Sequence, residues 1–148
     1  MIQAIVNGQV FDGEALLQNK TVLIKDGRIL AVVDNAQIPT HVTDVYDLCG
    51  GTLVPGFIDL QVNGGGGVLF TAAPTVASLR TIGTVHRQYG TTGFLPTLIT
   101  TSFVVMCQAV AAVRQAISEG VPGILGIHLE GPFLNPERRG IHDAHKFI

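Results

Sequence analysis

Three short apolar runs and the helical segments between them constrain the fold of this chain most strongly. The apolar runs cover residues 57–62, 92–99 and 124–129. Residues 74–89 repeat apolar side chains at helical spacing, and Ser102 can cap a second helix that runs to about Glu119. Strands that alternate with helices build parallel sheets, because each helix returns the chain to the edge where the next strand begins. The second part of the chain therefore predicts an α/β fold with a parallel sheet.

Proline and glycine mark where both helices should begin and end. Pro74 suits the first turn of the first helix, since its missing N–H has no partner there in any case. Gly90 suits the exit of this helix, and Gly120 followed by Pro122 suits the exit of the second.

The residues before about position 55 form a different pattern, of short strands divided by turns. Asn7-Gly8 separates two of them, and Asp26-Gly27 separates residues 21–25 from residues 28–33. Two more short strands are expected near residues 42–48 and 51–55. We expect a small β domain over residues 1–55 and the α/β unit over residues 56–148.

The α/β unit is too small to close by itself. Three strands and two helices do not complete a (β/α)8 barrel, which takes about 250 residues. The chain is also 47% hydrophobic and only 14% charged, against about 25% charged in an ordinary soluble domain. This composition indicates strands buried on both faces, or a surface that more protein covers. We expect an incomplete unit, either a fragment or a chain that needs a partner.

Charge and hydropathy exclude several classes of protein. A net charge of −2 disfavours nucleic acid as a partner. No run approaches about 18 apolar residues, so no membrane span is expected, and polar residues interrupt the N-terminus too early for a signal peptide. Cys49 and Cys107 are far apart and outside any CxxC motif, which predicts buried free thiols in a reducing compartment. A cytoplasmic protein is expected.

The segment GIHLEGPFLN ends an apolar strand in a carboxylate, Glu130. Functional side chains gather at the carboxyl ends of parallel strands, and His128 points to the same side as Glu130 because the two are two positions apart. A single carboxylate can bind a divalent cation but is not a metal site alone. The residues alone favour a structural interpretation, in which Glu130 is solvated or paired with an Arg such as Arg138.

The other histidines carry weaker signals. His142, Asp143 and His145 follow one another closely, and an H-x-x-H spacing puts both rings on one face of a helix. Such a pair can bind metal or can be a polar edge, and His142 could instead donate a hydrogen bond to a substrate. The HExxH motif of zinc proteases is absent. His41 and His86 are expected on the surface.

The stretch FIDLQVNGGGG, residues 57–67, holds Asp59 inside an apolar strand. A buried Asp needs partners, so Asp59 could accept backbone N–H bonds that anchor the loop. The glycines at 64–67 match neither a Walker A loop nor a dinucleotide-binding loop. They permit tight packing beneath a neighbouring segment, or a backbone cradle for an anion.

Three segments together carry a resemblance over essentially the whole chain. LVPGFIDLQVNGGGGVLF, TTGFLPTLITT and GIHLEGPFLNPERRGIH resemble the N-terminal part of the N-acetylglucosamine-6-phosphate deacetylase family, within the amidohydrolase superfamily. The resemblance implies a (β/α)8 barrel preceded by a small β-sandwich, with the barrel incomplete in this chain. It implies hydrolysis of N-acetylglucosamine 6-phosphate to glucosamine 6-phosphate and acetate, and a homo-oligomer, a dimer or a tetramer.

The resemblance also implies roles for individual residues. Glu130 matches the metal-binding glutamate of the family, and Ile141 and His142 fall on the segment that contacts the sugar. The remaining metal ligands and the general-base Asp are expected outside this chain, which alone is expected to be inactive. Many amidohydrolases carry His-x-His where this chain has Gln61 and Asn63. Amides are weak zinc ligands, so one divalent metal ion, Zn²⁺ or Fe²⁺, is expected rather than two.

Two other functions remain open at this point. One is an amidohydrolase that acts on a cyclic amide, against which the absence of His-x-His argues. The other is a non-enzymatic module that works by association, for which the missing half of the barrel argues.

Overall fold

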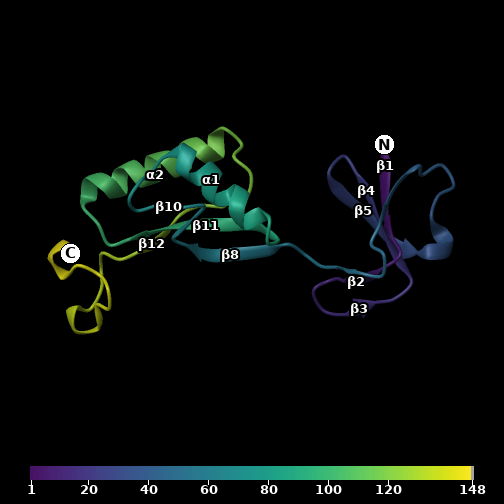
Figure 1. Ribbon diagram of the computed structural model, residues 1–148, viewed down its shortest axis with the longest axis horizontal. Helices are drawn as coiled ribbons and strands as arrows, with labels where there is room; N and C mark the ends of the chain where they lie inside the picture. The colour runs from purple at the N-terminus through teal and green to yellow at the C-terminus, as the bar shows by residue number, and fades with distance from the viewer. Residues whose placement is uncertain (148) are drawn as a thin grey trace. The chain divides into compact units, whose positions relative to one another are not determined.

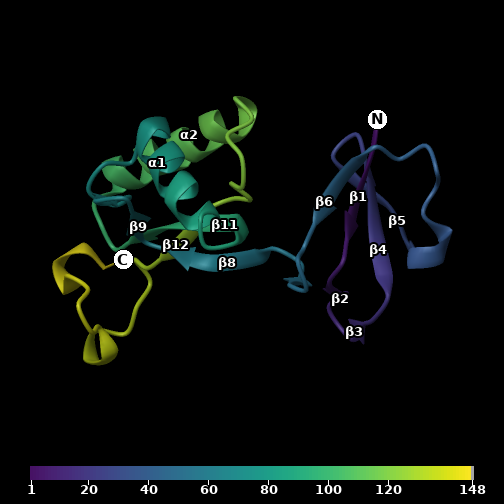
Figure 2. The same ribbon diagram turned by 45° about the vertical axis from the view of Figure 1, so that its right-hand side comes forward.

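The computed structural model describes residues 1–147 and divides the chain into two compact units, Met1–Pro55 and the residues from Gly56 onward (Figures 1 and 2). No helix in the described part of the chain combines the length and the apolar character that crossing a bilayer requires.

The first unit consists of two small sheets. One has the order β5-β4-β1-β6 and the other the order β3-β2-β7. The strands of the first sheet are β1 (Ile2–Val6), β4 (Lys20–Lys25), β5 (Arg28–Asp34) and β6 (Asp44–Asp47). Those of the second are β2 (Gln9–Phe11), β3 (Leu16–Leu17) and β7 (Thr52–Leu53). A 3-10 turn, η1 (Asn35–Gln37), follows β5.

The two turns predicted in this unit have different outcomes. The Asp26-Gly27 turn is confirmed, because Lys25 pairs with Arg28 and both turn residues have positive φ, 51° and 73°. This is the geometry that lets two antiparallel strands join in two residues. The Asn7-Gly8 turn is not a hairpin, since β1 pairs with β4 and β6 while β2 pairs with β3 and β7. At Asn7 the chain passes from one sheet to the other.

The second unit is a parallel sheet with helices on one face (Figure 1). Its order is β12-β11-β8, and both neighbouring pairs are parallel, as the alternation of strands and helices predicts. The elements are β8 (Phe57–Val62), α1 (Val76–Arg87), β11 (Thr91–Ile99), α2 (Phe103–Ser118) and β12 (His128–Glu130). A short hairpin, β9 (Gly64–Gly65) with β10 (Val68–Leu69), follows β8, and 3-10 turns η2 (Pro136–Arg138) and η3 (Ala144–Lys146) follow β12.

The helix limits follow side-chain capping. The Ser102 hydroxyl accepts a hydrogen bond from the backbone N–H of Val105, so the predicted cap of α2 is confirmed. The prediction for Pro74 is wrong: Thr75 caps α1 by accepting from Ser78 N, and Pro74 lies before the helix. A capping hydroxyl satisfies an N–H that the first turn leaves free, and this determines where the helix begins.

The third strand is shorter than predicted. The backbone near Ile124 makes two hydrogen bonds to Phe94, but the continuous strand begins only at His128. Gly123, with a φ of +86°, and Gly126 flank this part of the chain, and residues with little conformational restraint weaken a ladder. The strand nevertheless ends at Glu130, as expected.

The core of this unit lies between the sheet and the two helices. Phe70, Leu79, Ile82, Phe94 and Leu98 are at most 2% exposed.

Strand β8 is covered less well, because Phe57, Ile58 and Leu60 are each more than 60% exposed. Cys49 and Cys107 are free and also exposed, which corrects the expectation of buried thiols.

Candidate functional site

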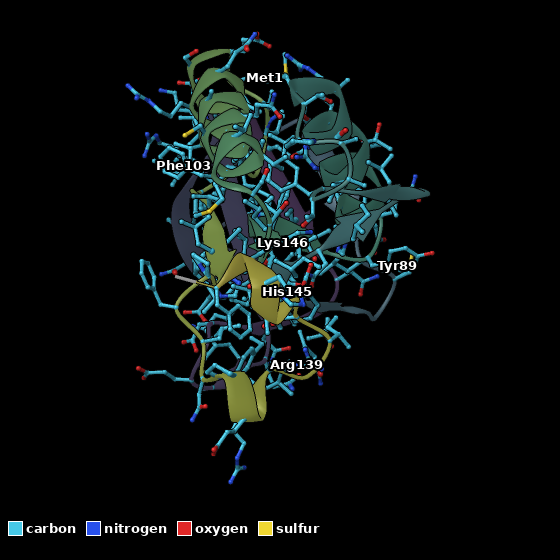
Figure 3. All side chains as sticks on the ribbon, turned by 90° about the vertical axis from the view of Figure 1, so that its left-hand side faces the viewer. Met1, Tyr89, Phe103, Arg139, His145 and Lys146 are labelled. Carbon is cyan, nitrogen blue, oxygen red and sulfur yellow. The ribbon has the colours of Figure 1, made fainter. Side chains whose placement is uncertain are left out.

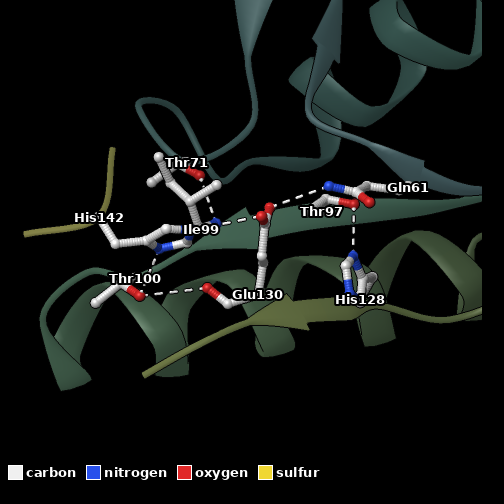
Figure 4. Close-up of polar contacts among 8 residues, drawn as sticks. All are labelled: Gln61, Thr71, Thr97, Ile99, Thr100, His128, Glu130 and His142. Atoms are coloured by element: carbon white, nitrogen blue, oxygen red, sulfur yellow. Dashed lines mark hydrogen bonds and ion pairs between the residues drawn. The ribbon is translucent and has the colours of Figure 1, made fainter. Parts of the chain in front are cut away.

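Polar side chains meet at the carboxyl edge of the parallel sheet (Figure 4). Gln61 comes from the end of β8, and Thr100 directly follows β11. Glu130 ends β12, where its partner in the β11 register is Ile99. The carboxyl ends of parallel strands share one edge, so residues far apart in the sequence come together there.

The Glu130 carboxylate is held from two sides. The Gln61 amide donates from Nε2 to Oε2 at 3.2 Å, and His142 Nε2 lies 3.4 Å from Oε1 (Figure 4). These are its side-chain partners, so the alternative pairing with Arg138 is not what the structure shows. A carboxylate offers about four lone-pair sites, so both oxygens keep acceptor capacity, and the side chain is 31% exposed. Glu130 is therefore anchored but open to a ligand.

His142 returns to this edge from the segment after β12. Its side chain is 9% exposed, and its Nδ1 lies 2.8 Å from the Thr100 hydroxyl. Both ring nitrogens therefore have a partner. The structure brings the two predicted site residues Glu130 and His142 together, whereas the third, Ile141, is 88% exposed.

Thr100 is a site residue that sequence reasoning missed. Its hydroxyl lies 3.3 Å from the backbone oxygen of Glu130 as well as 2.8 Å from His142, and the residue is 8% exposed. Gly131 packs directly on it, since a Cβ at position 131 would lie 2.1 Å from Thr100 Oγ1. The only available signal was a run of threonines at the end of an apolar strand.

A second threonine–histidine pair lies further back along β11 and β12, away from the carboxyl edge. Thr97 is fully buried, and its hydroxyl lies 3.1 Å from His128 Nδ1, its partner in the parallel register (Figure 4). Thr71 fixes the same edge by accepting a hydrogen bond from the backbone N–H of Ile99 at 3.2 Å.

The polar residues of β8, and Asn63 directly after it, have separate roles. Asp59 accepts the backbone N–H of Gln61 at 3.0 Å, so the expectation that it binds backbone N–H is confirmed. Gln61 points to Glu130, and Asn63 is half-buried and accepts the Phe70 N–H through its backbone oxygen.

The four glycines form the start of a hairpin that packs on α1. Gly66 and Gly67 make its turn, with φ of 62° and 79°. A Cβ at Gly65 would lie 3.1 Å from His86, and the His86 ring contacts the Gly64 carbonyl at 3.0 Å. His86 is half-buried and stacks on Phe94, so its predicted surface position is wrong. Close packing, one of the two uses expected for the glycines, is confirmed.

The pair His142 and His145 does not form a joint site. Asp143 accepts the backbone N–H of His145 and caps the 3-10 turn η3, in which the His145 side chain is exposed (Figure 3). This backbone hydrogen bond, together with the positive charge of Lys146, lowers the pKa of Asp143.

Within residues 1–147 there is no group of three or more His, Cys, Asp or Glu side chains that could hold a metal ion. Glu130 has the chemistry and the open lone pairs of one ligand, which by itself is not a complete site. This edge can therefore contribute one carboxylate to a metal and one imidazole to a bound molecule.

Comparisons with known proteins agree on one family. The family model of the NagA composite domain matches residues 3–53. The chain is 56% identical over 97 residues to an N-acetylgalactosamine-6-phosphate deacetylase of Shewanella sp. (strain ANA-3), a match that covers 66% of this chain and 25% of that protein. It is 35% identical over 142 residues to the N-acetylglucosamine-6-phosphate deacetylase of Haemophilus influenzae, covering 96% of this chain and 37% of that protein. The chain thus spans between a quarter and two fifths of the length of these relatives.

Solved structures give the same result in three dimensions. The N-acetylglucosamine-6-phosphate deacetylase of Pasteurella multocida superimposes on the whole chain with a TM-score of 0.95 at 32% identity, and 39% of that protein is covered. A variant of the Mycobacterium smegmatis enzyme, in complex with N-acetyl-D-glucosamine-6-phosphate, matches with a TM-score of 0.81 at 29% identity over 37% of its length.

Proposed function

Since this chain belongs to the N-acetylglucosamine-6-phosphate deacetylase family, where it corresponds to the N-terminal part, we propose that it serves the deacetylation of N-acetylglucosamine 6-phosphate. The observation that carries the proposal is the match of the whole chain to the Pasteurella multocida enzyme at a TM-score of 0.95. The products are glucosamine 6-phosphate and acetate. The chain spans only part of the length of its relatives, so the proposal concerns a protein of their length, called the full-length enzyme below.

In this proposal residues 1–55 belong to a β-sandwich, and residues 56–148 supply the first three strands of a (β/α)8 barrel. Two observations support the barrel. The outer edges of β8 and β12 carry no further strand among the described residues, and apolar side chains of β8 are exposed. Open edges and exposed apolar side chains are what further strands and helices would cover.

The proposal includes one divalent metal ion, Zn²⁺ or Fe²⁺, with Glu130 as its ligand from this chain. The chemistry of the donors favours a single ion, because the amides Gln61 and Asn63 are weak ligands and Gln61 is engaged in orienting Glu130. A bound ion would lower the pKa of a coordinated water molecule to about 7, far below that of free water, and would polarise the acetamide carbonyl.

His142 and Ile141 are proposed to contact the sugar. His142 Nε2 lies 3.4 Å from Glu130 Oε1, so the ring is next to the proposed metal ligand, beside which the acetamide would be held. Ile141 is exposed and offers an apolar surface to the sugar ring.

The reaction requires water oxygen to bond to the acetyl carbon and the carbon–nitrogen bond to break. The amine leaves with the proton that a general base has taken from the water. That base is an Asp expected outside this chain. The residues described here bind and orient, and they do not transfer this proton.

A single observation favours a second substrate. The relative with 56% identity is named a deacetylase of N-acetylgalactosamine 6-phosphate. This sugar differs in the orientation of one hydroxyl, so the same chemistry would apply. We assign N-acetylglucosamine 6-phosphate to the proposal and N-acetylgalactosamine 6-phosphate to its alternative.

Acetate release by the full-length enzyme decides between them. Both 6-phosphate sugars and both unphosphorylated sugars should be assayed side by side. A kcat/KM at least tenfold higher for N-acetylglucosamine 6-phosphate supports the proposal, and the reverse ratio supports the alternative. No turnover of either phosphorylated sugar would refute both.

The metal assignment has its own test. Glu130→Gln keeps the shape but removes the charge, so the metal content of the full-length enzyme should fall at least tenfold, because a carboxylate is a far better ligand than an amide. Glu137→Gln, on the exposed turn η2, is the matched control and should keep the metal. Equal metal content in both variants would remove Glu130 from the ligand set.

A homo-oligomer and a cytoplasmic location complete the proposal. A phosphorylated sugar is charged and does not cross a membrane unaided, so an enzyme that acts on it must share its compartment.

Light scattering of the full-length enzyme would establish whether it is a dimer, a tetramer or a monomer.

A further inference from the structure

Strand β5 is an apolar strand at the edge of its sheet. It ends the order β5-β4-β1-β6, and no strand pairs with its outer edge in the described part of the chain (Figure 2). Its sequence is RILAVVD, so five apolar residues lie between Arg28 and Asp34. Ile29, Leu30 and Val32 are 70%, 54% and 42% exposed. Such an edge can pair with another strand, because its outer backbone N–H and C=O groups have no partner in the sheet.

The sequence of β5 is complementary to itself in the antiparallel direction. When two copies pair about a twofold axis at Ala31, Arg28 of each copy lies opposite Asp34 of the other, and the apolar residues 29–33 lie opposite one another. A twofold axis brings the same surface of both copies together, so each favourable pair forms twice. Parallel pairing in register would instead put Arg28 opposite Arg28, and like charges directly opposite each other destabilise a sheet.

Both charged ends of the strand are available to a partner. Arg28 is exposed and makes no ion pair within residues 1–147. The Asp34 side chain is 58% exposed, although one of its oxygens contacts Lys20 Nζ at 2.6 Å. Its second oxygen can accept hydrogen bonds from a guanidinium. We propose that β5 is a self-association surface, which pairs antiparallel with β5 of a second copy of this chain and places Arg28 opposite Asp34.

The expected dimer is weak. One pair of edge strands buries less surface than the about 1,200–2,000 Å² that stable protein–protein interfaces bury. A register shift opposite Leu23 and Ile24 also leaves Leu30 without a cross-strand partner in β4. This is a β-bulge, which bends its strand and limits pairing at an edge. We therefore expect the dimer at high protein concentration.

Sedimentation equilibrium of the 148-residue chain tests the association. At up to about 1 mM, the weak end of specific binding, the wild type should form a dimer. Arg28→Asp and Asp34→Lys should each weaken the dimer about tenfold, because each puts like charges opposite one another twice. Arg114→Asp makes the same change of charge at an exposed position of α2 and is the matched control. It should change the dissociation constant less than about twofold.

A mixture of Arg28→Asp and Asp34→Lys separates charge pairing from general apolar contact. Each copy of one variant meets opposite charges on the other variant at both ends of the strand. The mixture should therefore form a heterodimer within about threefold of the strength of the wild-type dimer. A mixture that does not associate would overturn the proposal. Single variants that dimerise as the wild type does, or a wild type that stays monomeric at 1 mM, would overturn it as well.

Asp34 also contacts Lys20, so circular dichroism must show that Asp34→Lys is folded. If it is not, Arg28→Asp and Leu30→Lys decide. Each should weaken the dimer about tenfold, because a charge within the apolar strand opposes edge pairing. Folded Arg28→Asp and Leu30→Lys chains with wild-type association would refute the pairing.

Amide hydrogen exchange locates the interface. Protection of residues 29–33 should rise with protein concentration, and a dimer without this rise associates through another surface and overturns the proposal. A monomeric full-length enzyme with residues 29–33 protected would show that its own chain covers β5, which would overturn the proposal for that enzyme. None of these readouts depends on turnover. An enzyme without deacetylase activity would therefore refute the proposed function and leave the test of β5 unchanged.

Discussion

At the residue scale, small side chains decide the geometry of the site. The sequence drew attention to Glu130 and His142 through their chemistry, and the structure places them 3.4 Å apart. Thr100 and Gly131 carry no such signal, because a hydroxyl and a glycine occur in many settings. Their importance follows from contact alone: position 131 has no room for a Cβ beside Thr100.

Gly131→Ala should therefore disturb the site. The added Cβ would meet Thr100 Oγ1 at 2.1 Å, and alanine is also strained at a φ of +98°. We expect the free energy of unfolding to fall by about 2–4 kcal/mol, the range of large single-residue effects with a named cause. Urea unfolding of the 148-residue chain measures this, and the NMR signals of His142 should shift in the folded variant.

Gly120→Ala is the matched control for this prediction. Gly120 also has a positive φ, +67°, but nothing lies within 4 Å of its added Cβ. Gly120→Ala should therefore lower the free energy of unfolding only by the backbone strain, about 1–2 kcal/mol. Equal losses of unfolding free energy in Gly131→Ala and Gly120→Ala would show that the contact with Thr100 does not affect stability.

At the scale of elements, local rules located most helices and strands but not their exact limits. The cap of α2 at Ser102 and the turn between β4 and β5 are as predicted, because each depends on a few neighbouring residues. The start of α1, the short β12 and the half-buried His86 differ from prediction. Each of these depends on a competing cap or on a distant segment, here Thr75, Phe94 and the glycine hairpin.

Ser102→Ala tests the cap of α2. The hydrogen bond to Val105 N is long, 3.4 Å, so the loss of unfolding free energy should be about 0.5–1 kcal/mol, at the low end for N-caps. Ser118→Ala, at the exposed end of the same helix, should change stability by less than about 0.5 kcal/mol. Chemical denaturation monitored by circular dichroism compares the two, and a larger effect at Ser118 would contradict the assignment of the cap.

At the scale of the whole molecule, the proposed function gives this chain only one side of the site. Glu130, Gln61 and His142 lie at one edge of the described sheet, and residues 1–147 contain no group of three or more His, Cys, Asp or Glu side chains that could hold a metal ion. Under the proposed function, the remaining metal ligands and the general base are therefore required for hydrolysis of the amide.

The 148-residue chain alone should therefore release no acetate from either N-acetylhexosamine 6-phosphate. The assay needs a preparation verified by mass, with added Zn²⁺ or Fe²⁺, and the Haemophilus influenzae relative as a positive control. Turnover above that of a Glu130→Gln chain would show that the missing groups are not required.

The sequence by itself determined the order of the elements and the candidate site residues. Alternating strands and helices predict a parallel sheet, and a carboxylate at a strand end is a candidate ligand, because both follow from residue type and local spacing. The expectation of a single metal comes instead from the resemblance to the amidohydrolases, many of which carry His-x-His where this chain has Gln61 and Asn63.

Only the tertiary structure decided which residues meet. Thr100 contacts His142, which is 42 positions away, and Gln61 contacts Glu130, which is 69 positions away. The parallel sheet brings its strand ends to one edge, and the segment after β12 folds back onto it. Such contacts depend on register and on a turn far from either residue, which no local pattern in the sequence encodes.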